Sequence, residues 1–551
     1  MRCRKLSIKI SCKKNDTSAK KETFFRILRK SILRLSRNTR DTGKHQTEKN
    51  QTVQVNYQIT ITGGKAMKMK KVLSFLLAGT IAISLAACGS AGSGSSTAET
   101  STADSSTADT STADTSDKTT EAVAGKSDAA TKLVIWTQAK DLETFANKYV
   151  EANPDVQIQT VVIEPANYVT KVQTALNAGQ TTPDIIVGEP QMLSTFYDAD
   201  YFEDLDQAPY NAQQYDGQVV DYVWKAGQSS DGHQKAISYQ ITPAGIYYRR
   251  DIAQKVLGTD DPDQVGQYFK DYNTVLSTAQ KMKDAGYRIF ASDGEMSYFA
   301  GDSAWVKDNK LVVDQARKDY MDLCISLYQK DLTAYANQWS TPWYQAMSGP
   351  IPILSADVQN GTDSAVNVWA DASTFSAATA NNATTEVFAY GLPSWGVLTL
   401  RDNVGATSGK WGVCSGPSSG FGGGTFIGIS KLSKQKEAAW DFLKFCTLNE
   451  DTANWWIKES QGDTVSLKSV LDQHKDDTND VYGGEKLYAF WLAQAEKIDY
   501  SKVTPYDTEI GQAWSDAIAA IKTGQSTKEE AVSNFYDVVQ STYPELTIDK
   551  G

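Results

Sequence analysis

The sequence is poor in the residues on which most catalytic and metal sites depend. Histidine occurs three times in 551 residues, at His45, His233 and His474, and none of the six cysteines has a partner at metal-site spacing. A His-x-x-x-His pair and a Gly-x-x-x-x-Gly-Lys loop are both absent from the chain after residue 88. We therefore expect no enzyme, no metal and no cofactor. A glycosidase would need only a pair of carboxylates, which a count of acidic residues does not exclude, but with so few histidines we expect no catalysis.

Long hydrophobic runs are also missing, with one exception. Three lysines follow Met67, the uncharged and largely apolar run Val72–Leu85 comes next, and Leu-Ala-Ala-Cys closes the stretch at Cys88. These features predict a secretory signal peptide over residues 67–87, because the run is too short for a comfortable permanent span. Leu-Ala-Ala-Cys also resembles the bacterial lipobox, which implies that Cys88 is lipidated and begins the mature protein. An uncleaved membrane anchor is the alternative.

The balance of charge differs on the two sides of this stretch. Residues 1–66 hold 17 basic and 4 acidic side chains, whereas residues 88–551 hold 35 basic and 62 acidic ones. The acidic part argues against nucleic acid as a partner. The basic part could be an arm for nucleic acid or a membrane surface. Gly63-Gly64, however, precedes Met67 as a translated ribosome-binding site would, so we interpret residues 1–66 as a mis-annotated N-terminal extension.

The part after Cys88 begins with a low-complexity segment. Residues 88–131 consist mainly of Ser, Thr, Ala, Gly and Asp, so they lack the apolar surface needed to offset chain entropy, and we expect a disordered tether. We expect the folded domain to span residues 132–551. Its three cysteines are Cys324, Cys414 and Cys446, which we expect to be buried free thiols, although one disulfide remains an alternative.

Strand and helix patterns alternate from Lys132 onward. Short apolar strands are expected at 132–136, 156–163 and 183–187, and helices at 142–152 and 167–178. This order predicts an α/β layer with a mostly parallel sheet. Ligands of such sheets bind beyond the carboxyl ends of the strands, which favours the segments Gln138–Asp141 and Gly188–Gln191.

These segments resemble the extracellular solute-binding proteins of ABC-type sugar importers. The resemblance is carried by KLVIW, NPDVQI, YVTKVQTALNAGQTTPDII, Ile237–Leu257, Thr274–Gly286, Gly409–Phe445 and AIAAIKTGQSTKEEAV, in that order. It implies a type II periplasmic-binding-protein-like fold of two lobes, each a central sheet flanked by helices, with a hinge near residues 240 and 423. Lobe 1 would comprise about 132–243 and 423–485, and lobe 2 about 244–422 and 486–551. Residues 349–359 depart from the family pattern.

The resemblance also implies a function. A monomeric lipoprotein, held by lipid such as palmitate on Cys88 at the extracellular face of the cytoplasmic membrane of a Gram-positive bacterium, would capture a carbohydrate, favoured as an oligosaccharide. It would deliver this ligand to ABC permease subunits. Two alternatives stay open: a surface glycan adhesin or sensor partner, and a binder of a non-sugar solute such as a peptide or polyamine.

Candidate ligand-binding residues follow from the strand ends and from the resemblance. A sugar site needs aromatic faces together with polar donors and acceptors. Trp339 and Trp343 are expected on one helix face in the core. Asp293 and Glu295 could equally form a plain Asp-Gly turn, and Trp136 could equally belong to the core. The candidates are Trp136, Gln138, Lys140, Glu189, Gln191, Tyr239, Thr242, Asp293, Glu295, Asp357, Trp395, Gly423, Gly424 and Thr425.

Overall fold

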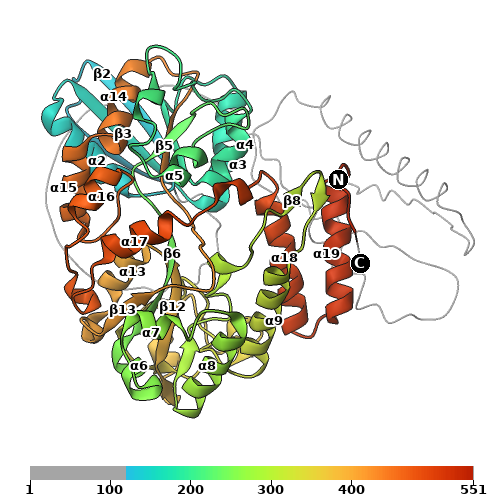
Figure 1. The fold of residues 1–551 in the computed structure, drawn as a ribbon. Coiled ribbons are helices and arrows are strands. Elements are labelled where there is room, and N and C mark those ends of the chain that lie inside the picture. The colour runs from blue at the N-terminus through green and yellow to red at the C-terminus, as the bar shows by residue number, and fades with distance from the viewer. Residues whose placement is uncertain (1–118, 550–551) are drawn as a thin grey trace, which may run out of the picture. The chain divides into compact units, whose positions relative to one another are not determined.

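A computed structural model describes residues 119–549, which belong to one compact unit of the chain (Figure 1). The predicted N-terminal extension, the signal peptide and the lipidated Cys88 lie outside these residues. Among residues 119–549, no helix has the length and apolar character needed to cross a membrane.

The first lobe is built on a six-stranded sheet. The strand order is β1 (Thr119–Ala124), β3 (Val156–Ile163), β2 (Thr131–Thr137), β4 (Ile185–Gly188), β14 (Phe426–Ile429) and β5 (Ala236–Ser238). Strands β3, β2 and β4 run parallel, whereas β1 and β14 run antiparallel to their neighbours. Every residue of β4, β14 and β5 is buried, as expected for strands covered on both faces. The predicted strands at 132–136, 156–163 and 183–187 are thereby confirmed.

Helices cover both faces of this sheet. In α2 (Asp141–Ala152), Leu142, Phe145, Ala146 and Tyr149 are buried, which is the spacing of an amphipathic helix. Figure 1 shows α2 and α14 on one side of the strands, and α3 and α4 on the other. The further helical segments are α3 (Pro165–Asn177), α4 (Pro190–Tyr197), η1 (Ala212–Tyr215), α5 (Asp221–Ala226), α14 (Lys436–Thr447), α15 (Glu450–Ser460), α16 (Lys468–Gln473) and η4 (Asp480–Tyr482).

The second lobe is built on a four-stranded sheet. Its order is β13 (Trp411–Cys414), β6 (Ala244–Arg249), β12 (Val387–Pro393) and β7 (Arg288–Phe290). Because successive residues of a strand face opposite sides, Tyr247 joins the apolar core shared with the first lobe and Tyr248 joins a second core. The helices of this lobe are α6 (Arg250–Leu257), α7 (Pro262–Gly266), α8 (Tyr272–Asp284), η2 (Ser297–Phe299), α9 (Gln315–Gln329), α10 (Thr341–Ser348), α13 (Gly396–Asn403), η3 (Gly405–Thr407), α18 (Asp507–Lys522) and α19 (Lys528–Thr542).

Residues 349–385, which the sequence left without an assignment, form a small layer of the second lobe. They contain α11 (Ala356–Gln359), α12 (Ala372–Ala378) and the pair β10 (Ile351–Pro352) and β11 (Thr384–Thr385). A third, smaller core lies here, in which Tyr328 and Tyr335 pack with Leu354, Val358, Val368 and Phe375. A second short hairpin, β8 (Val306–Lys307) and β9 (Lys310–Leu311), completes the lobe.

The chain passes between the sheets three times. It crosses after β5, returns between β13 and β14, and crosses again between α16 and α18, along the stretch that contains α17 (Leu487–Ala495) and η5 (Tyr500–Lys502). The first two crossings pair as a short ladder, in which the Ala244 N–H donates to Gly420 O (2.8 Å) and the Gly422 N–H donates to Thr242 O (3.2 Å). These paired crossings lie at the two places where the sequence predicted a hinge.

The predicted start of the folded domain at Lys132 is wrong. Strand β1 pairs with β3 along its whole length, from Thr119 opposite Ile163 to Ala124 opposite Ile158. Only Ala124 among its residues is buried, so ladder hydrogen bonds rather than apolar burial hold the strand. For that reason its composition resembled the tether, and the folded part begins at Thr119 or earlier.

The cysteine prediction is confirmed for the described residues. Cys324, Cys414 and Cys446 are all buried and none is in a disulfide. Burial raises the pKa of each thiol. These cysteines therefore act as small apolar side chains.

Candidate functional site

Two side chains predicted from strand ends meet at the edge of the first sheet. Gln138 follows β2 and Glu189 follows β4, and these strands are parallel neighbours. Parallel neighbours present their carboxyl ends at one edge, so residues 51 positions apart come together. Gln138 Nε2 donates a hydrogen bond to Glu189 Oε1 (2.9 Å).

This pair presents hydrogen-bond acceptors. Burial raises the pKa of the Glu189 carboxyl, and the hydrogen bond from Gln138 partly offsets that effect. None of the ion pairs among residues 119–549 involves Glu189. Gln138 Oε1 is buried without a hydrogen-bond partner. A buried acceptor without a partner is costly, so this edge suits a ligand that brings donors.

Gly423 lies between this pair and the second lobe. A Cβ atom there would lie 3.8 Å from the Glu189 carboxyl carbon and 3.4 Å from Trp395 Nε1. Its φ of +76° is one that residues with a side chain rarely adopt. Trp395 immediately precedes α13, and its indole N–H donates to Gly422 O (3.0 Å). The returning crossing therefore brings residues of both lobes to one place.

Three aromatic rings form a cluster beside Gly423, which we call the aromatic platform: Trp395, Trp339 and Tyr298. Trp395 stacks on Trp339, with centroids 5.5 Å apart and planes at 28°, and meets the edge of Tyr298 at 6.3 Å. Burial raises the pKa of Tyr298 to about 12, and the charge of Glu189 acts in the same direction. Trp395 of the platform and Glu189 of the acceptor pair thus both lie next to Gly423.

The prediction that Trp339 lies in the core, on one helix face with Trp343, is wrong. Helix α10 begins at Thr341, and Trp339 precedes it with a φ of +69° and 46% of its surface exposed. Trp343 alone is in the core, as predicted. Ser340 before a proline in the first helical turn signals a helix start, and this signal would have put Trp339 outside the helix.

Several other candidates belong to a buried network at the crossings. Tyr239 OH donates to Asp141 Oδ2 (2.8 Å), and Thr425 Oγ1 donates to Gln240 Oε1 (2.9 Å). Gln240 in turn lies 3.4 Å from both carboxylate oxygens of Asp463, whose pKa burial raises to about 7. Tyr239 and Thr425 are buried, so they fix the crossings and present no face to a ligand.

Thr242 and Gly424 flank Gly423 at the same crossings. Thr242 Oγ1 donates to Gly423 O (3.4 Å), and the φ of Gly424 is +112°. A Cβ atom on Gly424 would lie 3.0 Å from the Phe426 ring. These two residues therefore shape the loop beside the acceptor pair and the platform.

Asp293 and Glu295 lie inside the second lobe. Asp293 pairs with Lys522 (2.7 Å) and accepts from Gln359 Nε2 (3.1 Å). Glu295 Oε1 accepts from Trp343 Nε1 (2.8 Å), and its Oε2 is buried without a partner. Neither carboxylate reaches the acceptor pair, so the prediction that they lie on a site loop gains no support from their position.

The four remaining candidates are scattered. Trp136 packs half-buried against the core of the first lobe, where its carbonyl accepts from Tyr168 OH (3.2 Å). Lys140 and Gln191 are exposed near the acceptor pair in sequence. Asp357 is exposed on α11, where it accepts from Thr362 Oγ1 (3.1 Å). The structure brings none of them into contact with the aromatic platform.

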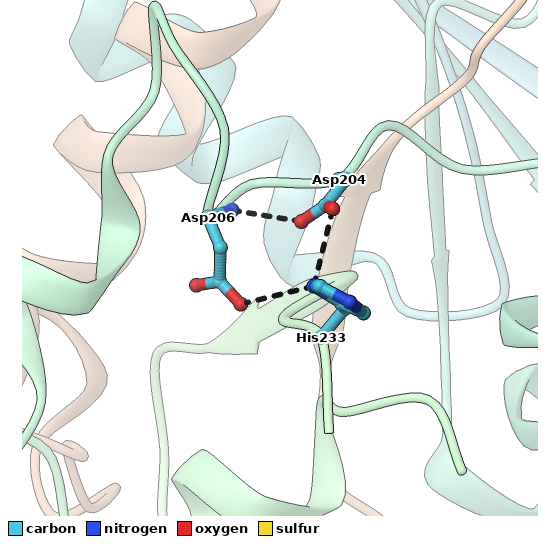
Figure 2. A group of neighbouring side chains, drawn as sticks. All are labelled: Asp204, Asp206 and His233. Carbon is cyan, nitrogen blue, oxygen red and sulfur yellow. Dashed lines mark hydrogen bonds and ion pairs between the residues drawn. The ribbon is translucent and has the colours of Figure 1, made fainter. Parts of the chain in front are cut away.

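One cluster has the composition of a metal site. Figure 2 shows His233 between Asp204 and Asp206, with its Nδ1 3.2 Å from one carboxylate and 3.8 Å from the other. Both carboxylates already accept backbone hydrogen bonds, Asp204 from the Asp206 N–H (3.0 Å) and Asp206 from the Gln234 N–H (3.0 Å). The cluster therefore stabilises a turn, and nothing links it to the acceptor pair.

The expectation that the chain after Cys88 contains no Gly-x-Ser-x-Gly spacing, which is typical of a hydrolase nucleophile, is wrong, because residues 416–420 have it. Ser418 Oγ donates to Phe299 O (3.3 Å). Of the two described histidines, His233 contacts Asp204, and His474 contacts Asp477 (2.5 Å) and Asn454 (2.8 Å). Neither is bonded to Ser418, so the base that would activate the hydroxyl is missing from the described residues.

Comparison with known proteins gives a family and a fold. A family model described as "Bacterial extracellular solute-binding protein" matches residues 144–481, more than half of the chain. Curated protein sequences give no match. Among solved structures, the ABC transporter associated binding protein from B. animalis subsp. lactis Bl-04, in complex with β-1,6-galactobiose, is 19% identical, with a TM-score of 0.55 over 76% of this chain and 99% of that protein.

Two other solved structures give the same result. The galacto-N-biose-/lacto-N-biose I-binding protein from Bifidobacterium longum is 16% identical, with a TM-score of 0.55 over 77% of this chain and 100% of its own. Maltose-bound MalE3 from T. maritima is 15% identical, with a TM-score of 0.54 over 75% of this chain and 100% of its own. At such identities the likeness shows the fold alone, and it confirms the predicted two-lobed α/β architecture.

Proposed function

The chain belongs to the family of bacterial extracellular solute-binding proteins, and from this premise we propose that it captures a carbohydrate between its two lobes. The ligand then passes to the permease subunits of an ABC importer. Closure about the paired crossings near residues 242 and 422 encloses the ligand, which requires tighter binding to the closed form than to the open one.

The observation that carries this proposal is that the acceptor pair and the aromatic platform meet beside Gly423. A sugar ring has apolar C–H faces, which stack on indole, and hydroxyls at its rim, which donate to carboxylate and amide oxygens. Gln138 Oε1 and Glu189 supply the acceptors, and Trp395 supplies the face. The structural neighbours bound to galactobiose, lacto-N-biose and maltose support a carbohydrate as the ligand class.

A polyamine ligand fits the site less well. A polycation needs several carboxylates in the cleft, and the sequence offered Glu189, Asp293, Glu295 and Asp357. Asp293 is neutralised by Lys522, Glu295 is enclosed beneath Trp343, and Asp357 is exposed on α11. Only Glu189 stands beside the platform, so one carboxylate would have to balance the whole charge of the ligand. The adhesin alternative uses the same site and differs only in lacking a permease.

A thermal-shift screen of residues 119–551 tests the ligand class. We expect at least one disaccharide or oligosaccharide to raise the unfolding temperature, because a ligand that binds only the folded state stabilises it by mass action, by about 2.7 kcal/mol at a hundred times its Kd. Polyamines and di- and tripeptides form the comparison set. Stabilisation by a polyamine or a peptide, with none by any glycan, would contradict the carbohydrate assignment.

We further propose that the protein works without catalysis, cofactor or metal, as a monomer. Ser418 lacks a histidine base among the described residues, and the His233 cluster is engaged in a turn. We retain the proposed lobes at about 132–243 with 423–485, and about 244–422 with 486–551. The first of these now extends back to β1 at Thr119.

The last part of the proposal concerns the anchor. We propose that Met67 or Met69 starts the translated protein, that residues 67–87 are removed, and that lipid on Cys88 holds the protein outside the cytoplasmic membrane, with a tether up to β1. We expect labelled palmitate to be incorporated into the wild-type protein and into a Ser90→Ala control, but not into Cys88→Ser, which should leave the membrane fraction. Label retained by Cys88→Ser would contradict the lipobox interpretation.

A further inference from the structure

The second lobe has two tryptophan side chains, Trp339 and Trp369, that are exposed to solvent. All thirteen tryptophans lie in the described part of the chain, and two of them are classed as exposed: Trp339 at 46% and Trp369 at 61%. Across residues 119–549 there are five exposed large apolar side chains, and three of them, Trp339, Ile353 and Trp369, fall within 31 residues of sequence. Exposed apolar side chains that gather in one region indicate a binding surface, whereas scattered ones do not.

Trp369 is exposed on a fixed backbone. Its neighbour Val368 is 4% exposed and belongs to the small third core. The Trp369 N–H donates to Asn367 Oδ1 (2.9 Å), and the Thr341 N–H donates to Val368 O (2.9 Å). Thr341 Oγ1 also donates to Ala370 O. The indole therefore stands on an anchored segment, and its exposure does not come from a loose loop.

The same hydrogen bonds locate this segment relative to the aromatic platform. Thr341 is the first residue of α10, and Trp339, two residues earlier, stacks on Trp395. The other end of α10 contacts η3, where Thr407 Oγ1 donates to Met347 O (2.6 Å). Residues 368–370 thus lie at the N-terminal end of α10, close to Trp339 of the aromatic platform.

We infer that Trp369, together with the exposed face of Trp339, forms an outer platform that binds the sugar units beyond the second of a glycan chain. The inference rests on the proposed function and specifies its ligand as an oligosaccharide. Stacking on an indole needs no particular hydroxyl pattern, so this outer platform selects for chain length more than for sugar identity. Trp395 and the acceptor pair hold the inner two units.

Titration calorimetry with chains of increasing length tests the inference. The probes are the disaccharide that gives the largest shift in the thermal screen and the chains of three to six units with the same linkage. We expect the wild type to bind the longer chains at least about tenfold more tightly than the disaccharide. Trp369→Ala should lose that advantage and keep the affinity for the disaccharide within about twofold. Val538→Ala, which removes an exposed apolar side chain (44%) from α19, is the control and should change neither.

The experiment distinguishes failure of the proposed function from failure of the outer platform. If no glycan of any length binds the wild type, the proposed function fails. If glycans bind, but Trp369→Ala leaves the affinity for long chains unchanged or weakens all lengths equally, only the outer platform is overturned. Acrylamide quenching of tryptophan fluorescence gives a second readout, since the longer chains should protect the exposed indoles in the wild type more than in Trp369→Ala. Equal protection in the two proteins would also contradict the inference.

Discussion

Replacing Glu295 by glutamine is expected to make the protein more stable than the wild type at pH 9 and leave its stability at pH 4.5 nearly unchanged. Glu295 is almost completely buried, and burial raises the pKa of its carboxyl from 4.5 to about 8. Hydrogen bonds from Trp343, Gly391 and Ser292 act in the opposite direction but are the smaller influence. Within residues 119–549, no cation pairs with it.

The sign of the effect follows from proton binding. Between about pH 4.5 and pH 8 the folded protein keeps a proton on Glu295 that the unfolded chain releases. The stability associated with this group is therefore fully present below pH 4.5 and is lost as the pH rises to about 8. A shift of this size corresponds to about 5 kcal/mol across the window, an order-of-magnitude figure. Glutamine keeps an acceptor for Trp343 and carries no charge. The Glu295→Gln variant therefore does not lose this stability as the pH rises.

Denaturant unfolding of both proteins at half-unit steps from pH 4.5 to 9 provides the measurement. The other buried carboxyls, among them Asp463 and Glu485 with pKa values raised to about 7, titrate in both proteins and cancel in the difference. Asp357→Asn, which removes an exposed carboxylate of the same lobe, serves as the control variant. Parallel curves for the wild type and Glu295→Gln would show that Glu295 is charged throughout.

Glu295 also contacts the layer of side chains on which the aromatic platform packs. Its carboxyl holds the indole of Trp343, whose ring lies 5.0 Å from that of Trp339, and Trp339 stacks on Trp395. Tyr298 and Tyr390 are the titratable side chains whose pKa values its charge affects, and both are raised mainly by burial. A proton on Glu295 thus keeps an uncompensated charge out of the layer beneath the platform.

The first-lobe half of the candidate site could be predicted from the sequence. Short apolar runs bounded by turn residues located β2 and β4, and the rule for parallel strands then placed Gln138 and Glu189 at one edge. Each step depends on local pattern alone. The fold class followed in the same way, because alternation of strand and helix leaves few architectures open.

The second-lobe half of the candidate site depends on contacts that no local sequence pattern encodes. From the sequence, Asp293 could be the start of a plain Asp-Gly turn. In the structure it pairs with Lys522, which lies 229 residues further along the chain. The role of Trp339 depends on a left-handed backbone conformation and on stacking with Trp395, 56 positions away. Strand β1 has almost no apolar burial, so only its pairing with β3 distinguishes it from the tether. In each case the deciding interaction is distant in sequence.

Replacing Trp395 by alanine is expected to weaken binding of the best glycan at least tenfold, which corresponds to about 1.4 kcal/mol. The substitution removes the stacking face, leaves Gly422 O without its donor and deprives Trp339 of its stacking partner. Trp395→Phe should lose less, because it keeps an aromatic face and loses only the indole N–H. The graded pair therefore separates stacking from the hydrogen bond that ties the platform to the returning crossing.

Trp455 provides the matched control for this prediction. It is a partly buried tryptophan on α15 of the first lobe, where it packs against Phe145 and Trp456. Trp455→Ala should lower stability, since it opens a gap in the core, and leave glycan affinity unchanged. Calorimetry on samples checked for cooperative unfolding compares the variants. If Trp395→Ala binds as tightly as the wild type, Trp395 does not belong to the site, and the acceptor pair at Gln138 and Glu189 must face some other surface.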